Sequence, residues 1–397
     1  MNFIFVSPQF PRVYWNFCDR LKKKGVNVLG IGDTPYDQLQ HEVRESLTEY
    51  YFVPSLADYD QMLRAVAFFT FKYGRIDWIE SNNEYWLASD AQLRTDFNVR
   101  TGWQMGDIEH IKNKSAMKPF YHKAGIPTAR LTKVTTLAAG EEFLAEVGYP
   151  VIVKPDTGVG ATDTYRIDNH DELRHFYASK PTVPYVMEEF VTGDICSYDA
   201  IVDADSNPIF ESMTVWPPSV MDIVLYQLDL SYYTTDIVPD ALKKAGRATL
   251  KAFHVHSRFV HLEFFRLTKD KPGLGKVGDF VGLEVNMRPA GGYTTDMMNF
   301  AHSTDVYEIW ADMITANRRL LPDRNEHYYC AYASRRDFHR YVHTHEDILA
   351  RYAGKIVMCE RMPEMMWPQM GNHMYTAKLN GQAETDEFIR YVQEQQG

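Results

Sequence analysis

The apolar positions in the first hundred residues predict strands and helices in alternation. Short apolar runs at residues 3–6, 26–31 and 76–80 are typical of buried strands, whereas residues 14–24 and 59–73 carry apolar side chains at helical spacing. Strands that alternate with helices in this way favour a βαβ unit and a parallel sheet. We therefore expect an α/β domain in this part of the chain.

Polar residues follow the third of these strands. Glu80 ends it and Glu84 lies just beyond, where parallel sheets commonly place a ligand crevice. Both carboxylates are candidate substrate contacts, and loop or capping roles are the alternative. No GxGxxG motif follows the first strand, so a dinucleotide site is not expected.

The pattern changes after residue 107. A basic amphipathic helix is expected over residues 108–124, another helix over 138–147 and a strand over 149–155. Lys154 lies on that otherwise apolar strand, where a buried ammonium group needs an anionic partner. The following loop, residues 156–164, consists largely of small and hydroxyl-bearing residues and could wrap backbone N–H groups around phosphate oxygens. Most loops of this kind are simple turns.

A strand over residues 186–191 ends in a polar turn that could offer backbone donors and acceptors to the edge of an adenine ring. An ordinary strand connection is the alternative. A strand over 196–202 and a helix over 240–254 are expected further along the chain. Residues 216–236 are aromatic and poorly periodic, so we expect an irregular segment on the substrate side.

Two stretches near the centre predict a β-hairpin with a long polar tip, residues 259–265 and 280–292. Every second side chain of a strand shares a face, so Glu284 and Asn286 lie on one side together with Arg288. Pairing of the strands can bring Glu263 beside Glu284, where like charges repel unless a cation lies between them. Because Mg²⁺ binds carboxylate oxygens and substrate phosphates, this face predicts a phosphate-handling metal site. A solvated, charged strand face is the alternative.

Composition narrows the class of protein. The 397 residues are 45% hydrophobic and 14% aromatic, which is ample for a large core. A net charge of −11 argues against a nucleic-acid scaffold and against binding to anionic membranes. The chain begins without a signal-like segment and has no apolar stretch of about 20 residues, so a cytoplasmic protein is expected.

Cysteine and histidine spacing does not predict a transition-metal site. The four cysteines are far apart in the sequence without a CxxC pair, and the fourteen histidines show no HExxH or paired-ligand spacing. We expect free thiols.

The last seventy residues predict a small α+β segment. Strands are expected at residues 331–334, 355–359 and 374–379, and helices at 346–352 and 385–395. The methionine-rich stretch from Met362 to Met374 could contact a substrate or a partner subunit, as in a homodimer, although core packing is the more common use of such residues.

Taken in order, these segments resemble the ATP-grasp superfamily over roughly residues 1–330. The stretches that begin at Asn113 and Gly148 look like the matching parts of biotin carboxylase and carbamoyl phosphate synthase. By this resemblance Lys114 and Lys154 would contact ATP phosphates, and Gly158 and Gly160 would form the phosphate loop. The adenine hinge would comprise Glu188, Glu189, Phe190 and Val191. The ligands for Mg²⁺, or for Mn²⁺, would be Glu263, Glu284 and Asn286.

The ending Arg288-Pro-Ala-Gly-Gly292 resembles the Glu-x-Asn-x-Arg-Pro-x-Gly segment of L-amino-acid ligases and related carboxylate-amine ligases. There Arg288 would hold the substrate carboxylate and the acyl-phosphate oxygens, with the N–H groups of Gly291 and Gly292 close by. The chain departs from the family at two places. Threonines replace glycines in the phosphate loop, and Ile195 stands where related ligases have a ribose-binding glutamate, so that either Asp194 takes its place or the ribose binds differently.

The resemblance implies an α/β ATP-grasp fold with four parts. These are a pre-ATP-grasp domain with a parallel βαβ sheet (1–107), two ATP-grasp subdomains (108–185 and 186–327) and the C-terminal α+β segment (328–397). It implies an ATP-dependent ligase that joins a small-molecule carboxylate to an amine through an acyl phosphate. The alternatives are a carboxylase or carbamoyl-phosphate-type enzyme that uses bicarbonate, and an ATP-binding module without turnover.

Overall fold

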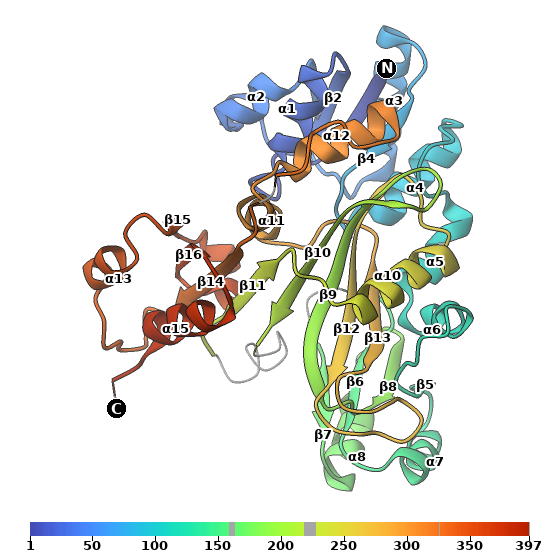
Figure 1. Ribbon diagram of the computed structural model, residues 1–397. Coiled ribbons are helices and arrows are strands. Elements are labelled where there is room, and N and C mark those ends of the chain that lie inside the picture. The colour runs from blue at the N-terminus through green and yellow to red at the C-terminus, as the bar shows by residue number, and fades with distance from the viewer. Residues whose placement is uncertain (159–162, 218–227, 325, 397) are drawn as a thin grey trace.

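The computed structural model describes residues 1–158, 163–217, 228–324 and 326–396, whose strands form three sheets (Figure 1). The first sheet is four-stranded and parallel, in the order β3-β2-β1-β4, as the apolar runs predict. Its strands are β1 (Asn2–Val6), β2 (Asn27–Gly32), β3 (Glu49–Phe52) and β4 (Trp78–Glu80). The helices of this region are α1 (Trp15–Lys23), α2 (His41–Ser46), α3 (Tyr59–Tyr73) and α4 (Leu87–Asp96). Polar residues from the segments after β1, β2 and β4 of this unit, among them Gln9, Gln40 and Glu84, line the cavity described below.

The second sheet is a small antiparallel one in the order β5-β8-β6-β7. It consists of β5 (Leu131–Lys133), β6 (Val151–Pro155), β7 (Tyr165–Ile167) and β8 (Tyr185–Glu189). Helices α7 (Leu137–Val147) and α8 (His170–Ser179) cover one face, where Phe143 and Phe176 pack on Val151 and Val153. The other face is free to line a site.

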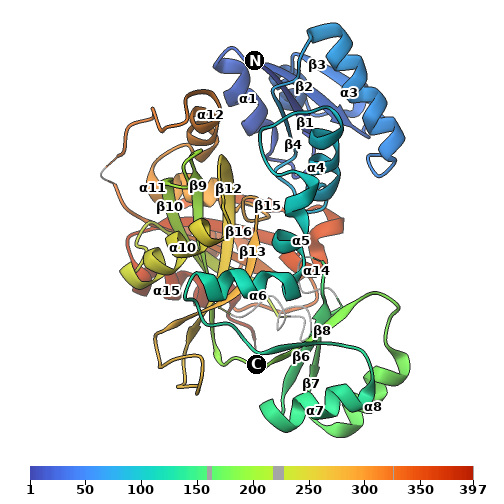
Figure 2. The ribbon, with the colours of Figure 1, turned by 90° about the vertical axis from the view of Figure 1, so that its right-hand side faces the viewer.

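The chain enters this small sheet through two helices rather than one, α5 (Ile108–Lys112) and α6 (Lys114–Lys123), seen from the side in Figure 2. The expected helix over 108–124 is interrupted because Asn113 has an extended backbone. The Lys114 N–H then donates to the Asp156 carbonyl at 2.9 Å, and the Ser115 N–H to the Asp156 carboxylate at 2.8 Å. A tertiary contact thus replaces helical hydrogen bonds and joins the start of α6 to the loop after β6.

The third sheet has eight strands in the order β13-β12-β9-β10-β11-β14-β16-β15, all antiparallel. Its strands are β9 (Gly193–Val202), β10 (Pro208–Trp216), β11 (Ser231–Thr235), β12 (Arg258–Leu267), β13 (Phe280–Asn286), β14 (Tyr329–Arg335), β15 (Ile356–Arg361) and β16 (His373–Leu379). The strands expected in the C-terminal segment therefore continue the large sheet.

Part of the segment expected to be irregular, residues 216–236, belongs to this sheet. β10 extends to Trp216, and β11 occupies residues 231–235. All five residues of β11 are buried, with Tyr232 in one apolar cluster and Tyr233 in another. A strand covered on both faces shows no alternation of apolar and polar residues, which is why periodicity missed it.

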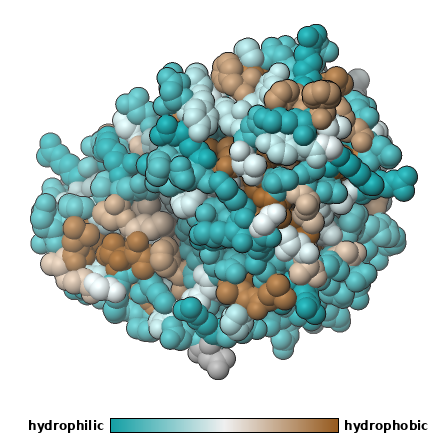
Figure 3. Space-filling model, turned by 90° about the horizontal axis from the view of Figure 1, so that it is seen from above, coloured by the Kyte–Doolittle hydropathy of each residue, from teal (hydrophilic) through white to brown (hydrophobic). Residues whose placement is uncertain are grey.

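The remaining helices are α10 (Asp240–Ala252), α11 (Thr294–His302), α12 (Val306–Ala316), α13 (His345–Arg351), α14 (Trp367–Met370) and α15 (Gln382–Gln393). Helix α12 returns to the N-terminal sheet, where Trp310 and Tyr307 meet the Phe17 ring of α1 edge to face. None of the helices in the described ranges has the length and apolar character that crossing a bilayer requires. Seen from above, polar side chains cover most of the surface and apolar ones gather in separate patches (Figure 3).

The predicted hairpin is present as β12 and β13, in the predicted register. Glu263 lies opposite Glu284, and His261 lies opposite Asn286. This places the candidate metal ligands side by side on one face.

Candidate active site

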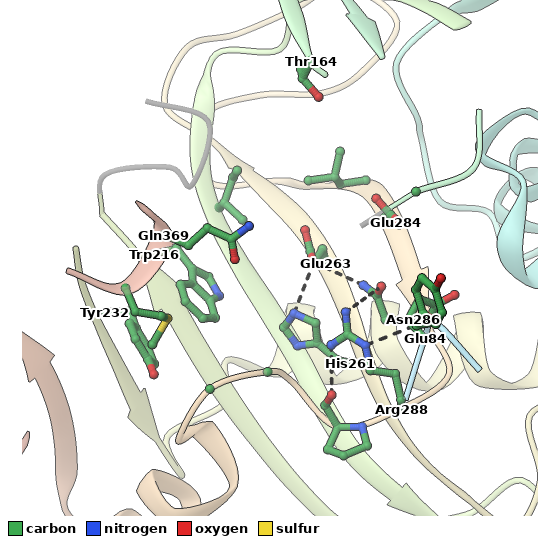
Figure 4. Close-up of a pocket in the computed structure, with 18 of the residues that line it drawn as sticks. Glu84, Thr164, Trp216, Tyr232, His261, Glu263, Glu284, Asn286, Arg288 and Gln369 are labelled. Carbon is green, nitrogen blue, oxygen red and sulfur yellow. Dashed lines mark hydrogen bonds and ion pairs between the residues drawn. The ribbon is translucent and has the colours of Figure 1, made fainter. Parts of the chain in front are cut away.

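A cavity of about 880 Å³ lies where the three sheets meet, and Figure 4 shows part of its lining. The segment after β4 contributes Glu84, and the small sheet and its loop contribute Lys154, Gly158, Glu188 and Phe190. The large sheet contributes His261, Glu263, Glu284, Asn286 and Arg288, and the segment between β15 and β16 contributes Pro363, Met366, Gln369 and Met370.

The two carboxylates of the hairpin face this cavity together with an amide (Figure 4). Asn286 Nδ2 donates to Glu263 Oε1 at 3.2 Å, and Lys114 Nζ lies 3.4 Å from Glu284 Oε1. Carboxylate and amide oxygens on one face match the ligand preference of Mg²⁺. The donor set therefore fits a hard divalent cation.

His261 belongs to the same face, although its position in the sequence suggested no role. Its Nδ1 lies 2.6 Å from Asp199 Oδ1 on β9, and its Nε2 lies 3.2 Å from Glu263 Oε1. Burial opposes the imidazolium, but these two carboxylates outweigh burial and raise the pKa of His261 to about 9. The sharing of a strand face with Glu263 was visible in the sequence, whereas Asp199, 62 residues away, was not.

Glu263 is held in its ionised form by the groups around it. Burial alone would raise the pKa of this carboxyl, but His261, followed by Arg288 and Lys114, lowers it below the ordinary value. A carboxylate kept ionised in a partly enclosed cavity is ready to bind a cation.

Lys154 has the anionic partner that its buried position requires. Its Nζ lies 2.6 Å from Glu188 Oε2, and Lys118 Nζ lies 2.6 Å from Glu188 Oε1. Burial opposes the charge on Glu188, but Lys154 and Lys118 lower the pKa of its carboxyl to about 2. The Glu188 side chain is therefore engaged with lysines, and residues 188–191 all line the cavity.

Lys114 connects the phosphate-loop candidates to the carboxylates. Its Nζ donates to the Gly158 carbonyl at 3.2 Å. The same Nζ lies 3.4 Å from Glu284 Oε1. Gly158 has a φ of +150°, a conformation that favours glycine. Gly160 lies outside the described residues.

Arg288 emerges beside the carboxylates and reaches Glu84. Its Nη2 donates to Asn286 Oδ1 at 3.2 Å, and its Nε lies 4.0 Å from Glu84 Oε2. Glu84 is 8% exposed, and burial raises the pKa of its carboxyl. Among the described residues, no donor makes a hydrogen bond to Glu84 Oε2. An unsatisfied acceptor next to Arg288 is a ready contact for a polar ligand.

Glu80, the other candidate after β4, has a different position. Arg258 holds it through contacts of 2.6 and 2.8 Å, and Arg94 lies 3.5 Å away. The described lining of the cavity does not include Glu80. Arg258 also donates to the Met287 carbonyl at 2.6 Å, so this buried ion pair fixes the end of β13 to the N-terminal sheet.

The hinge candidates have mixed surroundings. Glu189 lies 2.8 Å from Arg130 and 3.4 Å from Lys271, while the Phe190 ring faces Arg166 at 4.9 Å. Val191 is buried. Ile195 lines the cavity, whereas Asp194 is exposed and is absent from its described lining. A ribose contact through Asp194 stays a prediction.

The turn after β13 passes close to the C-terminal segment. Gly291 and Gly292 both line the cavity. Gly292 has a φ of +64°, and a Cβ there would lie 3.0 Å from Met370 Cε. The backbone conformation and the close approach both favour glycine at this position.

One wall of the cavity is apolar. Trp216 and Tyr232 stack with ring centroids 4.2 Å apart, and Met366 and Met370 complete this wall. Met362 and Met374 are instead buried in the core beside them. Core packing, one of the two uses considered for the methionine-rich stretch, is therefore found at Met362 and Met374, while contact of Met366 and Met370 with a substrate or a partner subunit stays a prediction.

Comparison with known proteins finds distant sequence similarity to ligases. No protein-family model matches the chain. The chain is 25% identical over 250 residues to the L-arginine-specific L-amino acid ligase of Bacillus subtilis. The matched region is 60% of this chain and 57% of that protein. The chain is also 29% identical over 132 residues to alanine–anticapsin ligase of B. subtilis strain 168, and this match covers 30% of this chain and 28% of that protein.

Two solved structures match over almost the whole chain. The L-amino acid ligase of Bacillus licheniformis has a TM-score of 0.73 at 15% identity, covering 98% of this chain and 96% of that one. N5-carboxyaminoimidazole synthetase of Staphylococcus aureus, complexed with ADP, has a TM-score of 0.70 at 13% identity with the same coverage. The fold is therefore shared with both enzymes.

Proposed function

We propose that this chain, which belongs to the ATP-grasp superfamily and is related to L-amino acid ligases, is an ATP-dependent carboxylate-amine ligase. The observation that carries the proposal is the shared strand face of the hairpin. It presents the two carboxylates and the amide of a cation site next to Arg288, in a cavity that Lys114 and Lys154 also line.

The proposed reaction has two steps. A carboxylate oxygen of the acid attacks the γ-phosphorus of ATP, the bond to the bridging oxygen breaks, and ADP leaves. A free amine then attacks the carbonyl carbon of the acyl phosphate, inorganic phosphate leaves, and the nitrogen releases a proton to solvent. No covalent bond to the protein is needed, because positioning and electrostatics account for most catalysis of phosphoryl transfer.

The phosphates would be bound by residues at the junction of the small and large sheets. Glu263, Glu284 and Asn286 would hold Mg²⁺, or Mn²⁺, which has similar ligand preferences, and such an ion neutralises charge on phosphate oxygens. Lys114 and Lys154 would contact the phosphates, with Lys154 exchanging part of its contact to Glu188 for them. The adenine would meet the backbone of residues 188–191.

The acid would be bound on the other side of the carboxylates. Arg288 offers a planar fork that matches a carboxylate, and the N–H groups of Gly291 and Gly292 are candidates for its acyl-phosphate oxygens. The apolar wall of Trp216, Tyr232, Met366 and Met370 leaves room for an organic side chain. This wall favours an amino acid or another organic acid over bicarbonate, which has no apolar part.

The test is ADP release with a panel of amino acids and other carboxylates, offered with Mg²⁺, ATP and an amine, followed by the mass of the product. We expect one class of organic acid to raise ADP release and to yield a product with the mass of acid plus amine minus water. ADP release with bicarbonate alone would favour the carboxylase alternative. No acid-dependent release with any amine would contradict the ligase proposal.

A further inference from the structure

The second group of titratable side chains lies in the C-terminal part of the large sheet. His345 is the first residue of α13, Cys359 lies on β15 and His373 begins β16. Their donor atoms, one from each residue, all lie within 4.8 Å of one another. No sequence motif marks this cluster, because successive members are 14 positions apart and only the fold brings them together.

The sheet register already sets two of the three groups at metal-ligand spacing. Cys359 pairs with Tyr375 and His373 with Arg361, so Cys359 and His373 are diagonal neighbours on the hairpin. Cys359 Sγ lies 3.3 Å from His373 Nε2. Ligand atoms around a tetrahedral Zn²⁺ lie about 3.3–3.8 Å apart, given bonds of about 2.0–2.3 Å. These two side chains therefore need little movement.

The third group is positioned by a helix cap and can adjust. Thr344 and Asp347 form a capping box, with Asp347 Oδ2 accepting from the Thr344 N–H at 2.8 Å, which fixes the start of α13. His345 is exposed, and its Nδ1 lies 2.9 Å from the Tyr375 hydroxyl. A hydrogen bond from one ring nitrogen orients the imidazole and leaves the other nitrogen for a metal.

The arginines near His345, Cys359 and His373 are engaged with other groups, so their charges do not exclude a Zn²⁺ ion from this cluster. Arg361 lies opposite His373 on the hairpin, and its guanidinium is paired with Asp337 at 2.5 and 3.0 Å. Arg335 bonds the His343 carbonyl at 2.7 Å. One thiolate and two imidazoles are ligands that Zn²⁺ prefers and Mg²⁺ does not. Among the described residues, no further His, Cys, Asp or Glu joins the three, so a fourth position would be open to solvent.

The cluster also brackets a wall of the active-site cavity. The chain between Cys359 and His373 contains Pro363, Met366, Gln369 and Met370, all of which line that cavity. A metal bound to both ends would fasten this segment where it leaves and rejoins the hairpin.

We propose that His345, Cys359 and His373 form a Zn²⁺ site that fastens α13 to the β15–β16 hairpin and so holds the methionine-bearing wall of the cavity. Binding of Zn²⁺ is independent of the proposed ligase activity. Only the effect on the cavity rests on the proposed function.

The test uses the reduced, metal-free full chain, titrated with Zn²⁺ against a chromophoric chelator in excess Mg²⁺, which occupies carboxylate sites. Cys359→Ser and His345→Ala remove ligands with little effect on packing. His41→Ala is the matched control, because His41 is also an exposed histidine at the first residue of a short helix. We expect each ligand variant to lose more than about tenfold in affinity, since even groups behind the ligands contribute about 10–100-fold. His41→Ala should bind as the wild type does.

Co²⁺ gives a second readout. The wild-type complex should show a thiolate-to-cobalt charge-transfer band that is absent in Cys359→Ser. Zn²⁺ should raise the melting temperature of the wild type and of His41→Ala, but not that of the two ligand variants. Equal Zn²⁺ affinity in wild type and Cys359→Ser, or a Co²⁺ spectrum without thiolate bands, would overturn the proposal. So would Zn²⁺ uptake that disappears in Glu284→Gln but persists in Cys359→Ser.

A last comparison concerns the cavity wall. If the chain is a ligase, Zn²⁺ should change KM for the acid more than KM for ATP, and only in proteins that retain Cys359. An unchanged KM for both substrates with intact Zn²⁺ binding would reject the coupling and leave the metal site in place. If the ligase assay shows no activity, the Zn²⁺ titrations still test the metal site.

Discussion

Lys154 Nζ lies 2.6 Å from Glu188 Oε2, so the lysine proposed to meet ATP phosphates already has an anionic partner inside the protein. Lys118 contacts the other oxygen of the same carboxylate at 2.6 Å. A triphosphate that reaches Lys154 therefore competes with Glu188. In the proposed function, the strength of this internal ion pair would set part of the affinity for the nucleotide.

Replacing Glu188 should separate stability from nucleotide binding. Glu188→Gln leaves the buried Lys154 and the half-buried Lys118 without their carboxylate, and breaking a buried ion pair costs about 3–5 kcal/mol of unfolding free energy. ATP should stabilise this variant more than the wild type, because its phosphates supply the missing charge. Urea unfolding and the shift in melting temperature on adding a non-hydrolysable ATP analogue measure the two effects.

Asp168→Asn, which removes the partner of a surface pair with Arg166, is the control and should cost about 1 kcal/mol or less. Equal shifts in wild type and Glu188→Gln would contradict competition for Lys154.

The same carboxylate predicts a pH dependence. The pKa of Glu188 is lowered from 4.5 to about 2 in the folded protein. A lowered carboxyl pKa contributes stability above the unfolded value, and that contribution is lost as the pH falls from 4.5 to 2. The loss amounts to about 3 kcal/mol. Urea unfolding across this pH range should show a steeper decline for the wild type than for Glu188→Gln, and parallel curves would refute the assignment.

The cation site can be tested through one carboxylate. Glu284→Gln keeps the shape of the side chain but removes its charge, so kcat should fall by roughly 10²–10³ with the circular dichroism spectrum unchanged. The concentration of Mg²⁺ needed for half-maximal activity should rise. Asp270→Asn, at the exposed tip of the same hairpin, should behave as the wild type does. Near wild-type turnover in Glu284→Gln would remove this residue from the mechanism.

Arg288 should distinguish acid binding from nucleotide binding. Arg288→Lys keeps the positive charge but loses the planar fork, so we expect strongly impaired saturation by the acid or impaired turnover. Affinity for a non-hydrolysable ATP analogue, measured by titration calorimetry, should change little. Arg266→Lys, on the exposed side of the paired strand β12, is the matched control. Lost nucleotide binding with normal acid saturation would reverse the assignment.

Two glutamates only four residues apart should respond in opposite ways. Glu80→Gln breaks a buried pair with Arg258 and should destabilise the ligand-free protein by about 3–5 kcal/mol. Glu84 has a raised pKa, and among the described residues its Oε2 has no hydrogen-bond donor, so Glu84→Gln should leave stability nearly unchanged while altering saturation by the acid or the amine. Denaturant unfolding and steady-state kinetics on both variants separate these roles. Comparable destabilisation in both would contradict them.

Local rules predicted the hairpin and its facing carboxylates. The period of two places Glu284, Asn286 and Arg288 on one face, and pairing of neighbouring strands brings Glu263 beside Glu284. The parallel N-terminal sheet followed from the same kind of pattern. Recognition of Lys154 as a charge in need of a partner was also local, whereas its partner Glu188 was expected to serve the adenine.

The features that the sequence did not predict depend on distant contacts. The break at Asn113 arises from hydrogen bonds to Asp156, and the ion pair that raises the pKa of His261 comes from Asp199 on another strand. β11 is buried on both faces, so it lacks the alternation by which strands are recognised. The continuation of the large sheet into β14, β16 and β15 depends on pairing across nearly a hundred residues.

The eight-stranded sheet has an evolutionary consequence. It joins the hairpin carboxylates and Arg288 to the strands that carry the methionine wall, whereas Lys154 and Glu188 belong to the separate four-stranded sheet. Substitutions in the segment between β15 and β16 could therefore alter the shape of the proposed acid pocket without changing the contacts between Lys154 and Glu188. A lineage of such proteins could then acquire new acids through changes in one peripheral segment while the residues proposed to face the nucleotide stay the same.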